Sequence, residues 1–250
     1  MAIKIASKQD QARGSFAGGL ILENKPIGFP QDGGHQKPFS NLFYWANAWS
    51  DHGGLIGEHP HKIFEIMSFI LEGGVEHYDS KFDRWLPLKK GDVQIIRSGS
   101  GITHAERLLE NSRIFQIWFD PNIEVSMNQE ATYNDYKAED IKYDGEESLS
   151  IKNYVGNNGP VKMESEGVEI KELKLMPGTH HLQLDGNKIH AYYMLDGDAN
   201  LEEDQLREHD FIIVENENKL KFVAHTETRI FNISVPQQLS YKTYLEHVKF

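Results

Sequence analysis

Short apolar segments separated by turn residues run through the middle of this chain, and they constrain its fold more than any other feature. The segments of strand length span residues 63–71, 75–78, 85–88, 93–96, 102–106 and 114–119, and an aromatic one precedes them at 42–46. Turn sequences such as Glu72-Gly73-Gly74 and Gly91-Asp92 close them. Short strands at near-regular spacing are typical of antiparallel sandwiches and barrels, so the sequence predicts an all-β fold.

A weak internal repeat predicts two β-domains. Leu71-Glu72-Gly73-Gly74 resembles Leu195-Asp196-Gly197-Asp198, and residues 90–96 resemble residues 208–214. We expect an N-terminal domain at 1–125, a polar linker or irregular region at 126–160 and a C-terminal domain at 161–250, with strands resuming at 168–176. The last ten residues, 241–250, fit either a short helix or an extra strand.

Four residues with metal-ligating side chains occur in two pairs, His59 with His61 and His104 with Glu106. On a β-strand, residues two apart point to the same face, so each pair can direct two ligands into one space. If the two strands are neighbours, three imidazoles and one carboxylate converge. This pattern predicts a mononuclear metal site, and its ligands suit Fe, Mn, Ni, Cu or Zn. Superposing the two halves places Gln183, Asp185, Phe222 and Ala224 opposite these four residues, so only the first domain is expected to hold the metal.

Three further polar residues are candidates for roles near the metal. Glu65 has the parity of both strand histidines, and we interpret it as a hydrogen-bond acceptor for a ligand imidazole or as a salt-bridge partner rather than as a fifth ligand. Gln94 and Gln116 interrupt apolar strands, so each lies either beside the ligands or on an outward face. His77 follows a hairpin turn and is expected to be exposed.

Aromatic residues gather at positions 43–49, just before the metal-binding stretch. Phe43, Tyr44, Trp45 and Trp49 are interpreted as core residues, with the wall of a ligand pocket as the alternative for Phe43 and Trp45.

The composition limits the classes of partner. The formal net charge of -12 and the absence of a basic cluster argue against direct nucleic-acid binding. The chain has no cysteine, which excludes thiolate chemistry. Because the sequence shows no apolar leader and no long uncharged apolar run, we expect a cytoplasmic protein that does not enter membranes.

The stretch H-P-H-K-I-F-E, followed by L-E-G-G-V-E-H-Y-D-S and by G-D-V-Q-I-I-R-S-G-S-G-I-T-H-A-E, resembles the pirin family, a bicupin group. The resemblance is strong over residues 50–120. It implies two cupin-type antiparallel β-barrel or jelly-roll domains in tandem. It also implies that His59, His61, His104 and Glu106 bind one iron-type divalent metal, with Fe(II) foremost and Mn, Ni, Cu or Zn as alternatives.

The same resemblance implies a function, since several bacterial pirins act as quercetin 2,3-dioxygenases and the animal namesake is a nuclear co-regulator. The first hypothesis is therefore a metal-dependent dioxygenase that opens a small flavonol-like aromatic with O₂, in which Glu106 also serves as a catalytic base. The second hypothesis is a metal-sensing or redox-sensing regulatory protein that acts through a protein partner.

Overall fold

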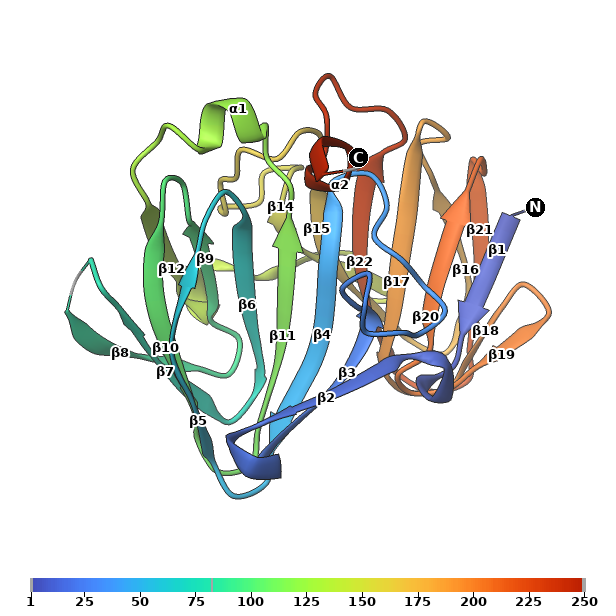
Figure 1. Cartoon of the computed structure of the whole chain (residues 1–250). Coiled ribbons are helices and arrows are strands. Elements are labelled where there is room, and N and C mark those ends of the chain that lie inside the picture. The colour runs from blue at the N-terminus through green and yellow to red at the C-terminus, as the bar shows by residue number, and fades with distance from the viewer. Residues whose placement is uncertain (1, 82, 249–250) are drawn as a thin grey trace. The chain divides into compact units, whose positions relative to one another are not determined.

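The computed structural model describes residues 2–81 and 83–248, which form two compact units (Figure 1). The first unit comprises residues 11–140, 163–165 and 239–248, and the second comprises residues 2–10, 141–162 and 166–238. The predicted all-β class is confirmed, because antiparallel strands dominate and the described α-helices α1 (Ile123–Ser126) and α2 (Tyr244–Val248) are short. None of the helices in the described residues has the length and hydrophobicity needed to span a membrane.

The first unit contains a seven-stranded sheet in the order β12-β9-β6-β11-β4-β3-β2 and a four-stranded sheet in the order β5-β10-β7-β8. Its strands are β2 (Ala12–Phe16), β3 (Ile21–Ile27), β4 (Leu42–Ser50), β5 (Gly54–His61), β6 (Glu65–Glu72), β7 (Gly74–Asp79), β8 (Arg84–Lys89), β9 (Val93–Arg97), β10 (Ile102–Leu108), β11 (Ser112–Phe119) and β12 (Thr132–Tyr136). Three-residue 3-10 turns lie at Ala17–Gly19 and Ala138–Asp140.

The second unit repeats this arrangement, with a seven-stranded sheet in the order β1-β20-β17-β22-β15-β14-β13 and a four-stranded sheet in the order β16-β21-β18-β19. Its strands are β1 (Ala2–Ala6), β13 (Tyr143–Gly145), β14 (Leu149–Val155), β15 (Glu169–Leu175), β16 (Gly178–Gln183), β17 (Lys188–Asp196), β18 (Ala199–Leu201), β19 (Asp204–Leu206), β20 (Phe211–Glu215), β21 (Lys219–Ala224) and β22 (Thr228–Pro236). A 3-10 turn spans Lys8–Asp10.

The strands predicted between residues 42 and 119 are present with shifted ends. The shift that matters most is at β6, which begins at Glu65 rather than at residue 63, because Ile63 has a φ of 68° and lies in the turn after β5. Pro87 lies in β8, the edge strand of its sheet, where a missing backbone N–H is tolerated.

The domain limits in the structure differ from the expected ones. Residues 126–160 are not a linker, because β12 pairs with β9 of the first unit while β13 and β14 belong to the second. Both ends of the chain also join the unit that is distant in sequence: β1 pairs with β20, and residues 239–248 belong to the first unit. The edge strand β12 (Thr132–Tyr136) is polar because much of its surface faces solvent, and its polar composition made it look like a loop in the sequence.

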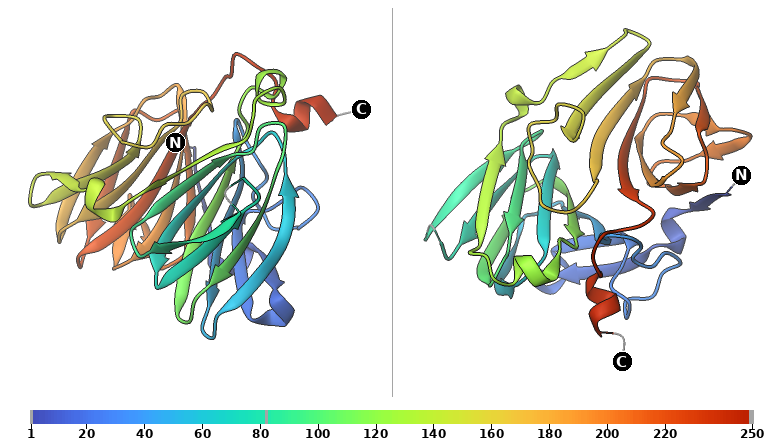
Figure 2. Two further views of the ribbon diagram at one scale, coloured as in Figure 1. Left: turned by 90° about the vertical axis from the view of Figure 1, so that its left-hand side faces the viewer. Right: turned by 90° about the horizontal axis from the view of Figure 1, so that it is seen from above.

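The C-terminal segment ends in the helix α2, which is one of the two alternatives left open by the sequence (Figure 2). The Tyr244 ring contacts the rings of Phe43 and Phe64 at centroid distances of 5.7 and 5.3 Å. The Tyr241 hydroxyl donates a hydrogen bond to the Asp120 carbonyl, and the Asp120 carboxylate accepts one from the Tyr244 N–H. Residues 249 and 250 lie outside the described residues.

Each unit contains an ion pair at the same position of the fold, and these two pairs give a residue-by-residue alignment of the two sequences. Arg113 lies opposite Glu72 across β11 and β6, and Arg229 lies opposite Asp196 across β22 and β17; both pairs adjoin a register shift and form salt bridges. The turn glycines that follow the two acids, Gly73 and Gly197, both have positive φ.

Starting from these two ion pairs, the strand registers extend the alignment to the small sheets. There the structural alignment differs from the counterparts that the sequence repeat predicted. Leu220 occupies the position of His104, and Phe222 that of Glu106, two residues away from the predicted counterparts. Leu182 and Leu184 occupy the positions of His59 and His61, one residue away from Gln183 and Asp185.

Candidate metal centre

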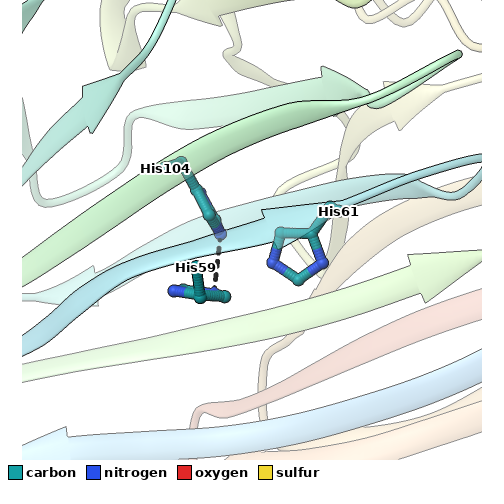
Figure 3. Close-up of side chains that lie close together, drawn as sticks. All are labelled: His59, His61 and His104. Atoms are coloured by element: carbon teal, nitrogen blue, oxygen red, sulfur yellow. Dashed lines mark hydrogen bonds between the residues drawn. The ribbon is translucent and has the colours of Figure 1, made fainter.

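Three histidines converge on one face of the small sheet of the first unit (Figure 3). Strands β5 and β10 are antiparallel neighbours, and their register places His59 opposite His104 and His61 opposite Ile102. One nitrogen of each of His59, His61 and His104 lies within 4.8 Å of the others. Residues two apart on β5 therefore share a face with His104, as the spacing predicted, and the three imidazoles could hold a metal ion.

Burial keeps two of these imidazoles, His61 and His104, in the neutral form that binds metals. His104 is 1% exposed, and burial lowers its pKa well below the usual value, with His59 and His77 adding to the effect. Burial followed by the proximity of His104 and His59 lowers the pKa of His61 to about 3. Because a metal ligates the neutral imidazole, His61 and His104 need no deprotonation near neutral pH.

Hydrogen bonds fix two of the three rings. The Nε2 atoms of His104 and His59 are 3.0 Å apart, and this contact is the dashed line in Figure 3. His59 Nδ1 donates to the Gly57 carbonyl at 2.8 Å, which orients the ring and leaves Nε2 directed at the cluster.

Glu106 is buried beside the cluster but is held by the opposite sheet. A register shift separates it from His104, because Glu106 lies opposite Ile56 rather than two residues along β5. Gln116 Nε2 donates to both carboxylate oxygens at 2.9 and 2.7 Å, and the Ser68 hydroxyl donates to one at 3.4 Å. The structure thus brings together three of the four predicted ligands and places the fourth against the wall of the large sheet.

The two glutamines lie on the inward face of the large sheet. The register aligns Gln94, Ser68 and Gln116 in one row across β9, β6 and β11. Gln116 contacts Glu106, whereas Gln94 is 1% exposed and donates to Asp135 at 2.9 Å. Of the two alternatives predicted for each amide, the position beside the site is the one that Gln116 occupies.

Glu65 does not contact the histidines, although it has their parity in sequence. The Ile63 turn starts a new strand between His61 and Glu65, so parity along one strand no longer applies. The Glu65 carboxylate accepts hydrogen bonds from the backbone N–H groups of Glu164 and Ser165 and lies 3.6 Å from Arg97. The salt-bridge alternative is therefore the one that the structure shows.

The aromatic residue nearest the cluster is Trp118, which the sequence interpretation had not singled out. Its ring lies edge-on to His61 at a centroid distance of 4.8 Å, and its buried Nε1–H makes no hydrogen bond. Trp45 is on the other face of the large sheet, packed against Phe115. Phe43 is a buried core residue that stacks on Phe64 at 4.6 Å and lies 6.5 Å from Trp118. Of the two alternatives, the structure shows the core position for both residues, and strand alternation explains it for Trp45, which lies opposite Ile117 and not Trp118.

His77 was expected to be exposed, but it is 1% exposed and extends the cluster inward. Its Nε2 lies 3.2 Å from His104 Nδ1, and its Nδ1 lies 4.0 Å from the Asp79 carboxylate. The register of β7 and β10 places His77 opposite Glu106 and Asp79 opposite His104. The H-x-D spacing of His77 and Asp79 is the signal that would have found them, because it matches the H-x-E spacing of the ligand pair.

Comparisons with known proteins agree with this fold and site. A sequence profile of the family described as Pirin matches residues 26–119, which include all three clustered histidines. A putative quercetin 2,3-dioxygenase of Zymomonas mobilis is 44% identical over 68 residues, and the quercetin 2,3-dioxygenase of Escherichia coli K12 is 41% identical over 68 residues. Over residues 26–119 the chain is therefore similar to the pirin family.

The sequence matches to these pirin relatives are partial, whereas the fold match is nearly complete. The two alignments cover 26% of this chain, and 28% and 29% of the respective relatives. The bacterial pirin YhhW of Escherichia coli, solved in complex with nickel(II), superposes with a TM-score of 0.78 at 20% identity, over 95% of this chain and 100% of that one. A quercetin 2,3-dioxygenase structure from Acinetobacter baumannii gives 0.79 at 16% identity, over 94% and 79%. The predicted bicupin architecture is confirmed.

Proposed function

We propose that the first unit binds one divalent transition metal through His59, His61 and His104, with Glu106 as the fourth ligand. The observation that carries this proposal is the convergence of three imidazole nitrogens within 4.8 Å. Nitrogen and carboxylate donors suit Fe(II) foremost, and Mn, Ni, Cu or Zn as alternatives. The nickel(II) complex of the similar bacterial pirin supports a metal in this fold.

We further propose that the protein is a dioxygenase that opens a flavonol such as quercetin. The names of the relatives from Zymomonas mobilis and Escherichia coli support this substrate class. A bound divalent metal supplies Lewis-acid polarisation of the flavonol oxygens and, when redox-active, a route for electrons to O₂.

The protein's own residues bind the substrate and accept its proton. Trp118 and His61 offer ring surfaces at right angles, against which a flat aromatic packs. Glu106 accepts the flavonol hydroxyl proton, since a buried carboxylate that keeps its acceptor oxygens near the reacting group is a competent base. Gln116 and Ser68 hold this carboxylate in place during the transfer.

Turnover of quercetin by metal-loaded protein tests the proposal. Protein loaded anaerobically with Fe(II) is mixed with quercetin and then with O₂, while the flavonol absorbance and released CO are followed. We expect loss of absorbance with stoichiometric CO. We expect Glu106→Gln, which keeps the three histidines but loses the carboxylate ligand, to bind the metal more weakly and, at saturating metal, to slow turnover by about 10²–10⁴-fold, the usual contribution of a general base.

A matched control separates the site from the rest of the chain. His181 is exposed on β16 of the second unit, so His181→Ala should leave turnover unchanged. Tight binding of quercetin without turnover by every metal tried would contradict the enzyme and favour the regulatory module that acts through a protein partner. In the enzyme proposal the protein works in the cytoplasm on a small molecule. Direct nucleic-acid binding is not part of the proposal, because the net charge of -12 repels phosphates.

A further inference from the structure

Behind His104, on the side away from His59, two more inward-facing residues continue the line of polar groups. His77 Nε2 lies 3.2 Å from His104 Nδ1, so both nitrogens of His104 are engaged. His77 Nδ1 in turn faces the Asp79 carboxylate at 4.0 Å. Both residues are at most 1% exposed, so no bulk water competes for these contacts.

The direction of the protons along this line follows from its first acceptor. The Gly57 carbonyl can only accept, so His59 Nδ1 carries a hydrogen, and a neutral His59 then presents a lone pair at Nε2. His104 Nε2–H must donate to that lone pair, which leaves His104 Nδ1 to accept from His77 Nε2–H. Without a metal, every hydrogen bond in the line therefore runs from His77 towards Gly57.

Metal binding requires the opposite tautomer of His104. Its Nε2 faces the cluster and must present a lone pair, so its hydrogen must be on Nδ1. His104 Nδ1–H then donates to His77 Nε2, and His77 carries its own hydrogen on Nδ1, facing Asp79. The number of protons on the two imidazoles does not change; only their positions do.

Asp79 is placed to favour this second arrangement. The carboxylate is completely buried, and its Oδ1 accepts the Lys81 backbone N–H at 2.8 Å, which fixes its orientation. A buried carboxylate close to His77 Nδ1 attracts a hydrogen at that nitrogen.

We propose that His77 and Asp79 are positioning residues that set the tautomer of His104 and thereby raise the affinity of the cluster for its metal. This inference rests on the metal-binding part of the proposed function, and it is independent of the substrate. A hydrogen-bonding partner behind a metal-ligating histidine contributes about 10–100-fold in metal affinity.

Zinc affinity tests the role of His77, with zinc(II) as the probe and a chromophoric chelator as competitor. We expect His77→Phe to weaken zinc binding by about 10–100-fold, because its ring fills the space but cannot accept from His104. His77→Gln should restore affinity to within a few-fold, since its amide oxygen accepts the same hydrogen. The control His181→Phe places the same exchange at an exposed site on β16 and should bind zinc as the unaltered chain does.

Nitrogen-15 NMR of the histidine rings tests the tautomers in the unaltered chain and does not depend on any variant folding. We expect His77 and His104 to carry hydrogen on Nε2 without zinc and on Nδ1 with zinc. Asp79→Asn should weaken zinc binding by less than His77→Phe, because the amide keeps a polar group at that place but loses the charge.

Two results would overturn the inference while leaving the metal centre intact: zinc binding by His77→Phe at full affinity, or a zinc-loaded His77 that keeps its hydrogen on Nε2. If the unaltered chain bound no zinc, nickel or iron at all, the metal centre itself would be overturned, and the inference with it. A purely structural role for His77 predicts lower thermal stability of both His77→Phe and His77→Gln with equal zinc affinity per folded molecule, which also contradicts the proposal.

Discussion

The interiors of the two units differ at the same positions of the same fold. In the first unit the inward positions of the small sheet hold His59, His61, His104 and Glu106, and in the second they hold Leu182, Leu184, Leu220 and Phe222. The leucines and Phe222 pack into one apolar cluster together with Tyr192. Where the Ser68 hydroxyl donates to Glu106 in the first unit, the Tyr192 ring contacts the Phe222 ring in the second, at a centroid distance of 5.8 Å. The second unit forms the same strand order with apolar residues at these positions, so the fold does not require an inward polar cluster. The histidines of the first unit therefore serve function rather than folding.

This comparison predicts that the second interior carries more of the folding free energy. Phe222→Ala removes a fully buried ring and should cost about 3–5 kcal/mol in the free energy of unfolding of the second unit. Circular dichroism reports the whole chain, whereas tryptophan fluorescence reports the first unit, since all four tryptophans, at positions 45, 49, 85 and 118, lie there. In Phe222→Ala the midpoint of denaturation should therefore shift more when it is measured by circular dichroism than when it is measured by fluorescence. An equal cost for Glu106→Ala in the first unit would break the comparison.

Giving the first unit a residue from the second should remove its chemistry. His104→Leu introduces the side chain found at position 220 and should lower metal affinity by roughly 100-fold or more, above the loss expected for a residue that only supports a ligand. Metal content after purification without chelator, measured by mass spectrometry, gives the answer. His61→Ala should behave in the same way. Full metal content in either variant would show that the ligand is misassigned.

The Gln116 amide should matter only while Glu106 is charged. Gln116→Leu removes both amide contacts to a buried carboxylate and should cost about 1–3 kcal/mol in the free energy of unfolding of the metal-free first unit. In a Glu106→Gln background the same exchange should cost less, because no buried charge loses its partner. Additive costs in this double-mutant cycle would mean that the two side chains are not coupled.

A pH dependence confined to the first unit is also expected. Burial raises the pKa of Asp120, the hydrogen bond from the Tyr244 N–H lowers it, and the nearby Glu246 raises it; together they move it from 3.8 to about 7. Between about pH 4 and 7 the folded state binds more protons than the unfolded state, so this group's contribution to stability is present in acid and is lost as the pH rises through 7. Asp120→Asn should flatten the curve of stability against pH in this window by up to about 4 kcal/mol, since one unit of pKa shift corresponds to about 1.4 kcal/mol.

The second unit offers the reference for that measurement. In the second unit the position corresponding to Asp120 holds Pro236, which has no titratable group. Fluorescence-monitored unfolding of Asp120→Asn should therefore change with pH relative to the unaltered chain. An identical pH curve for the two proteins would show that Asp120 titrates alike in the folded and unfolded states.

Much of the fold and the core of the site were predictable because they depend on local periodicity. The two-residue spacing of His59 and His61 sufficed to place both on one face, and the turn glycines marked the hairpins. Prediction failed where the structure depends on pairing between strands distant in sequence or on the backbone angle of a single residue. The turn at Ile63 separates Glu65 from the histidines, and no sequence pattern reveals that β1 pairs with β20.

His77 and Trp118 show the same limit for side chains. A histidine just after a hairpin is usually solvated, but the H-x-D spacing of β7 places His77 and Asp79 inward with the ligands of β10. Alternation along β11 turns Trp118 towards His61 and its neighbour Ile117 away. From the sequence alone, the four aromatic residues at positions 43–49 were equally good candidates for a position beside the metal site. Sequence periodicity thus predicted which residues share a face of a strand, but not which side of a sheet becomes the interior.

The assignment of both chain ends to the unit distant in sequence has a consequence for synthesis. A ribosome makes the N-terminal part first, and domains commonly fold in that order as they emerge. Here the strand β1 has no partner until β20 has been translated, and the Phe43 ring has no contact with Tyr244 until residue 244 has been translated. Neither unit can therefore finish folding while the rest of the chain is still being synthesised. A nascent chain halted near residue 140 would expose both the unpaired strand β1 and an uncovered aromatic surface.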